Sequence, residues 1–174
     1  LTQLGTPVSG HSIVVMTIGG NDLQLAIFLG SDPTATILTN AIARIRTTVT
    51  ALQDPADFPD GTSIYIGNVY DPSDGEGQIA IPMVITCFLG QPLPELVAAL
   101  DVWRDAYVTL GMELRFSAVD MLGHFHGHGH HFDNMANPYY DAADPTLWFY
   151  DCVHPNNRGH HELRRLFYQA IDGA

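Results

Sequence analysis

The sequence has few basic residues, few cysteines and no long apolar run. Lysine and arginine together number only 7 among 174 residues, against 19 aspartates and glutamates, for a formal net charge of -12. A phosphate backbone repels such a chain, so we expect no nucleic-acid partner. No uninterrupted apolar run reaches about 18 residues, and we expect no membrane span. The two cysteines, Cys87 and Cys152, permit either one disulfide or two buried thiols.

Size and composition favour one domain or most of one. The chain is 46% apolar over 174 residues, which is enough to bury one core. Few basic side chains beside an excess of acidic ones are common in secreted microbial enzymes, so we expect a secreted or extracytoplasmic protein. No residue pattern indicates a cofactor, and we expect none.

Strand and helix patterns alternate along the chain. Residues 12–18 form a continuous apolar run that ends in glycines, as in a parallel strand buried on both faces. Further strands are predicted at 62–69 and 113–119, and helices at 34–52, 94–110 (with Gly111 as the stop) and 157–171. This alternation predicts parallel strands with helices covering the sheet, in one layered α/β unit.

An acid and a base lie three residues apart before the last predicted helix. A histidine that acts as a general base needs a carboxylate on its other ring nitrogen. On a turn, Asp151 can reach back to His154, and Pro155 stiffens the exit. A helix-capping aspartate beside a surface histidine is the alternative interpretation of this pair.

An amide side chain follows the first predicted strand, in the run Gly19-Gly20-Asn21-Asp22. Open α/β proteins place their sites at the carboxyl edge of the sheet, where this run must lie. The side-chain N–H of Asn21 could there donate to the oxyanion of a tetrahedral intermediate. An ordinary Asn-Asp turn or a helix cap is the alternative.

These motifs resemble those of the SGNH (GDSL-type) hydrolases. Residues 19–22 (GGND) are similar to the third block of that family, and residues 151–156 (DCVHPN) to its fifth, Asp-x-x-His-Pro. Residues 68–72 (NVYDP) and the closing run 159–167 are also similar to bacterial members. The resemblance implies a three-layer α/β/α sandwich with a parallel, flavodoxin-like sheet. Residues 1–174 would be the C-terminal major part of one such domain, with the N-terminal strands absent from this chain.

The resemblance also implies an activity, the hydrolysis of lipid esters, small esters or acylated sugars by Ser-His-Asp acyl transfer. His154 would be the base, Asp151 its acid partner and Asn21 an oxyanion donor. The catalytic motif around Asn21 would be supported by its neighbours in the turn, Gly19, Gly20 and Asp22.

The family's nucleophile is missing from this sequence. Its serine lies on a Gly-Asp-Ser block after the first strand, a glycine of a second block completes the oxyanion hole, and neither block is here. Ser12 enters a strand instead of following one, so we reject it as nucleophile. We expect the serine and two strands to come from a companion polypeptide cut from a longer precursor, or from a swapped protomer. The alternatives are a catalytically inactive scaffold fragment and a sequence shorter than the whole protein. Without those strands, residues 12–18 form an open edge.

A histidine-rich segment supports a competing hypothesis. Residues 123–133 read GHFHGHGHHFD. Alternate histidines in an extended segment project to one side, and two of them with Asp133 could bind zinc or copper. A metal-binding protein or metal-dependent hydrolase using residues 124–133 is therefore the alternative function. The glycines favour a flexible loop instead, forming a wall or lid of an acyl pocket lined by Phe125 and Phe132.

Overall fold

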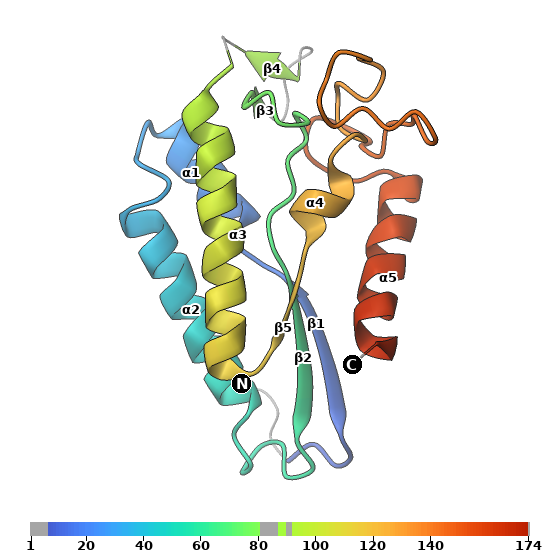
Figure 1. Ribbon diagram of the computed structural model, residues 1–174. Coiled ribbons are helices and arrows are strands. Elements are labelled where there is room, and N and C mark those ends of the chain that lie inside the picture. The colour runs from blue at the N-terminus through green and yellow to red at the C-terminus, as the bar shows by residue number, and fades with distance from the viewer. Residues whose placement is uncertain (1–6, 81–86, 90–91, 174) are drawn as a thin grey trace.

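The computed structural model describes residues 7–80, 87–89 and 92–173. A sheet lies in the middle, with helices on both of its faces (Figure 1). The elements in chain order are β1 Ser12–Thr17, α1 Gly20–Phe28, α2 Thr36–Leu52, β2 Thr62–Gly67, β3 Ile79–Ala80, β4 Phe88–Leu89, α3 Pro94–Leu114, β5 Ser117–Val119, α4 Met121–Phe125 and α5 Asn157–Asp172. The predicted α/β class, with three layers around a parallel sheet, is confirmed.

The sheet brings three strand ends to one edge. Its order is β1-β2-β5, and both pairings are parallel. Thr17 pairs with Gly67, and Gly67 pairs with Val119. Because these carboxyl ends are in register, the segments that follow them leave the sheet side by side, where α/β proteins usually place their sites.

Each face of the sheet has its own core. On one face, α1, α2 and α3 pack on β1 and β2 in the larger core, whose most deeply buried side chains are Ile45, Val49, Ile66, Trp103 and Tyr107. On the other face, α5 covers β2 and β5, and Phe167 packs against Tyr65 and Val119. No helix within these described ranges is long and apolar enough to cross a membrane.

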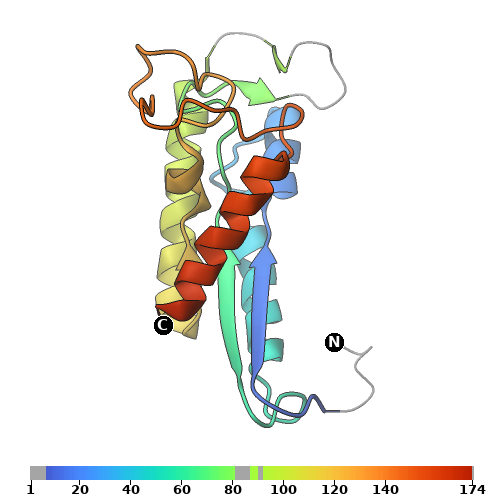
Figure 2. The ribbon, with the colours of Figure 1, turned by 90° about the vertical axis from the view of Figure 1, so that its right-hand side faces the viewer.

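The prediction that β1 is buried on both faces is wrong for the described chain. Ile13 is 56% exposed and Val15 47% exposed. Val15 stands opposite Tyr65, so its side chain is on the face that α5 covers, but α5 lies over the other two strands. Among the described residues β1 pairs with β2 alone, at the edge of the sheet (Figure 2).

The predicted boundary between α3 and β5 is also wrong. The helix continues through Gly111 to Leu114 and ends where Arg115 takes a left-handed conformation with φ 59°. Residues 113–114 are therefore helical, and the strand begins only at Ser117. Gly111 serves a different purpose, because a β-carbon there would collide with the main-chain oxygen of Phe116.

Two helices were not predicted from the sequence. The run after β1, expected to be a tight turn, opens α1 directly, with Gly19 as its N-cap. The start of the histidine-rich segment is α4, which Asp120 caps by accepting from the N–H of Gly123. Both helices begin at the carboxyl edge of the sheet, immediately after β1 and β5.

Candidate active site

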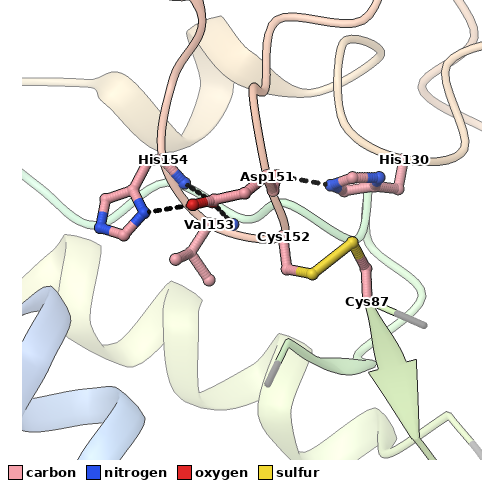
Figure 3. Close-up of a disulfide and its surroundings, with 6 residues drawn as sticks. All are labelled: Cys87, His130, Asp151, Cys152, Val153 and His154. Carbon is pink, nitrogen blue, oxygen red and sulfur yellow. Dashed lines mark hydrogen bonds and ion pairs between the residues drawn. A yellow bond between two sulfur atoms is a disulfide. The ribbon is translucent and has the colours of Figure 1, made fainter. Parts of the chain in front are cut away.

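Asp151 and His154 are in contact on the turn that precedes α5. Asp151 Oδ2 lies 2.8 Å from His154 Nδ1, and Oδ1 accepts from the N–H groups of Val153 at 2.9 Å and His154 at 2.7 Å (Figure 3). One carboxylate therefore both builds the turn and orients the ring. The side chain of His154 is 69% exposed and that of Asp151 41%.

Asp151 remains ionised far below neutral pH. Burial would raise its pKa, but the N–H groups of His154 and Val153, with the His154 ring, outweigh it and lower the pKa to about 2. A carboxylate held in its charged form stabilises an imidazolium on the neighbouring histidine. The pair thus has the electrostatics that a general base and its acid partner require.

Asn21 lies in the first turn of α1. Gly19, which caps this helix, has φ 98°, and Tyr107 Oη donates to the carbonyl of Ile18 just before it. Asp22 Oδ1 lies 3.1 Å from Arg44 Nη2, and this ion pair ties the start of α1 to α2. The turn between β1 and α1 is therefore held by Tyr107 of α3 and by Arg44 of α2.

A cavity of about 450 Å³ at the carboxyl edge of the sheet brings the two motifs together. Asn21 and His154 both line it, with Gly19, Gly20 and Asp22. Its apolar lining includes Ile18, Leu23, Ile27, Leu96 and Leu100. No serine and no cysteine is among the lining residues in the part of the chain that the structure describes. The arrangement places an imidazole and a side-chain amide beside an apolar space.

The two cysteines form a disulfide. Cys87 is joined to Cys152, with their Cα atoms 4.8 Å apart (Figure 3). The sequence left open whether they were bonded or free. Because Cys152 follows Asp151 directly, the bond fixes the turn that carries Asp151 and His154 to the residue just before β4.

The histidine-rich segment is not an extended strand of ligands. His124 lies in α4, the His128 ring stacks on Trp148 with centroids 3.5 Å apart, and His131 Nε2 lies 2.8 Å from Gln78. The rings of His128 and His131 thus have separate partners. Within residues 7–80, 87–89 and 92–173, no group of three His, Cys, Asp or Glu side chains could hold a metal ion.

The expected lid over the cavity is not observed either. Phe125 is fully buried and packs with Trp148 and Phe149, and neither it nor Phe132 lines the cavity. The segment is instead held by Asp74, whose carboxylate accepts from three alternate main-chain N–H groups, those of residues 127, 129 and 131.

Substitution of Gly19 by alanine is expected to lower the free energy of unfolding by about 2–4 kcal/mol. Its φ of 98° disfavours a side chain, and a β-carbon would collide with Tyr107 Oη and the ring of Trp103. Gly20→Ala is the matched control, because the nearest atom to its β-carbon is Val69 Cγ1 at 3.9 Å. Urea unfolding of both variants measures the difference, and equal effects would contradict a special role for Gly19.

Several solved ester hydrolases are similar to this chain. A mutant of an acetyl-xylooligosaccharide esterase from Geobacillus matches with a TM-score of 0.55 and 20% identity, over 90% of this chain and 57% of that chain. An extracellular lipase from Streptomyces rimosus matches at 0.59 and 16%, over 93% and 70%. A phospholipase A1 from Streptomyces albidoflavus matches at 0.54 and 16%, over 96% and 72%. No protein-family model and no curated protein sequence matches the chain.

The matches cover nearly all of this chain, which spans 57% of the length of the esterase. At 16–20% identity, the shared property is the fold. In this chain the fold is a parallel sheet between helical layers, with the strand order β1-β2-β5. The resemblance noted in the sequence is thus confirmed at the level of the fold, which this chain shares with these solved ester hydrolases.

Proposed function

We propose that this chain is the acid–base part of a serine ester hydrolase. His154 is the general base, Asp151 its acid partner and Asn21 an oxyanion donor. The observation that carries this proposal is that Asn21 and His154 line the same cavity. The His154 Nδ1 contacts Asp151, which leaves Nε2 on the opposite side of the ring for a nucleophile. The similar esterase, lipase and phospholipase all act on carboxylic esters by their names, and we assign this chain that substrate class.

In the proposed reaction, His154 Nε2 takes the proton of a serine hydroxyl as its oxygen attacks the ester carbonyl carbon. The resulting oxyanion accepts a hydrogen bond from the side-chain amide of Asn21. Nε2 then passes the proton to the leaving alcohol, and the acyl group stays on the serine. Water releases the acid by the same two steps, with His154 again as base.

The serine, in this proposal, comes from a segment outside residues 1–174 that pairs with β1. One edge of β1 has no partner among the described residues, and this edge, with the exposed Ile13 and Val15, suits an added strand and the layer that would cover it. Thr17, the last residue of β1, lines the cavity. A parallel strand added beside β1 would therefore end at the cavity and deliver its next residue there. A companion polypeptide or a second protomer can supply such a strand.

We also place the protein outside the cytoplasm. Its disulfide is of a kind that persists in oxidising compartments. One of the similar structures is an extracellular lipase. The ratio of 7 basic to 19 acidic residues agrees with this location.

A fluorophosphonate probe, which reacts with activated serines, tests the proposal. The protein is expressed from its complete coding sequence, labelled, and analysed by intact-mass and peptide mass spectrometry. We expect one adduct, on a serine outside residues 1–174, and its loss in the His154→Ala variant. An adduct on Ser12, or no adduct on any serine, would show that the proposed division of the site is wrong.

A further inference from the structure

The turn that carries the acid–base pair is anchored by other parts of the chain. His130 Nε2 lies 3.1 Å from the main-chain oxygen of Asp151 (Figure 3). The next residue, Cys152, is bonded to Cys87. A third anchor holds Val153, the residue immediately before the base. The histidine-rich segment thereby contributes a support to the turn, although it does not reach the cavity.

Tyr70, in the segment after β2, supplies the third anchor. Its Oη donates to the carbonyl oxygen of Val153 at 2.9 Å. Its ring stacks on Phe125 with centroids 5.0 Å apart and meets Phe149 edge-on at 5.5 Å, so the hydroxyl is held in one place. Burial, with the negative charge of Asp151, raises the pKa of Tyr70 to about 12, so the hydroxyl stays a donor at working pH.

The exposure of His154 makes these anchors important. With 69% of its side chain exposed, the ring has little packing to hold its direction over the cavity. Its orientation must therefore come from the Asp151 contact and from the main chain of the turn. The peptide between Val153 and His154 is the last main-chain unit before the ring, and Tyr70 holds its carbonyl.

We propose that Tyr70 is the positioning residue of the acid–base pair, whose hydroxyl fixes the Val153–His154 peptide and so sets where His154 meets the cavity. The catalytic consequence of this role rests on the proposed function. Tyr70 also lines the cavity, but its hydroxyl acts through the turn, because it donates to the main-chain oxygen of Val153. A small rotation of that peptide would move Nε2 relative to Asn21, and misplacement of a catalytic group by about 1 Å can cost about 10²-fold in rate.

The variant Tyr70→Phe removes the hydroxyl and keeps the aromatic ring. We expect the amides of Val153 and His154, both bonded to Asp151 Oδ1, to exchange with solvent on the order of tenfold faster. The amide of Ile66, in β2, should be unchanged. In the assembly that hydrolyses esters, kcat should fall on the order of tenfold with KM within about twofold. Tyr168→Phe, a change at an exposed position of α5, is the matched control.

Hydrogen exchange read residue by residue separates the outcomes. Unchanged exchange at Val153 and His154 in Tyr70→Phe would overturn the proposal, whatever the rate of hydrolysis. Faster exchange that includes Ile66 would also overturn it, since Tyr70 would then support the whole fold. Faster exchange confined to the turn supports the anchor even if the unmutated protein hydrolyses no ester, and in that event only the proposed function is wrong.

Discussion

Replacing His154 by alanine is expected to lower kcat/KM for a simple ester by at least about 10³-fold in the assembly that carries the serine. In the proposed reaction the imidazole takes the serine proton, and Asp151 Oδ2 lies 2.8 Å from its Nδ1. Because His154 is exposed, its loss leaves the core intact and the free energy of unfolding nearly unchanged. Stopped assays over a range of ester concentrations measure the loss.

A control variant at another exposed histidine distinguishes the loss of the proposed base from the loss of any imidazole side chain. His160 is also exposed, lies on α5 and does not line the cavity. His160→Ala should hydrolyse the ester at the unmutated rate. If both variants keep full activity, the chain is a scaffold with the fold of a hydrolase, and the catalytic roles proposed for Asp151 and His154 are wrong.

The elements of the fold that could be predicted are those whose residue pattern lies within a short stretch of the sequence. The apolar run of β1, the apolar spacing of α2 and the start of α5 each appear close to the predicted place. The end of α3 was missed because Gly111 usually marks a helix stop. In the structure it admits the main chain of Phe116, a contact that no local pattern shows. The start of α1 was missed because two glycines before an Asn-Asp pair also favour a turn.

The candidate site also has a part that the sequence predicted and a part that it did not. Asp151 and His154 were predictable as a pair, because three residues on a turn place them in contact. Asn21 lies near this pair only because the sheet brings distant segments of the chain to one edge. The order of the two motifs along the sequence was enough to suggest this arrangement. The anchor from Tyr70 spans 83 residues and depends on the packing of α4 against the aromatic cluster. The resemblance of residues 68–72 to the family marked that segment without indicating its contact.

Removal of the disulfide is expected to lower the free energy of unfolding by about 4 kcal/mol, since it closes a loop with a sequence separation of 65 residues. The variant Cys87→Ala/Cys152→Ala and the reduced unmutated protein should agree, because each opens the same loop. Urea unfolding with and without reductant gives both values. Alkylation without reductant should leave the mass unchanged, and alkylation after reduction should add two groups. A loss below about 1 kcal/mol in both would show that the bond contributes little in solution.

The disulfide can constrain the unfolded chain, the turn that carries Asp151 and His154, or both. Measuring stability and the rate of hydrolysis together separates these effects. Cross-linking the unfolded chain changes stability but not the rate of hydrolysis by molecules that remain folded. Holding the turn changes that rate as well, because Cys152 lies between Asp151 and His154. Since His130 and Tyr70 anchor the same turn, we expect the folded fraction of the alanine variant to keep most of its kcat. A fall in kcat beyond that of Tyr70→Phe would make the bond, and not the tyrosine, the principal support of His154.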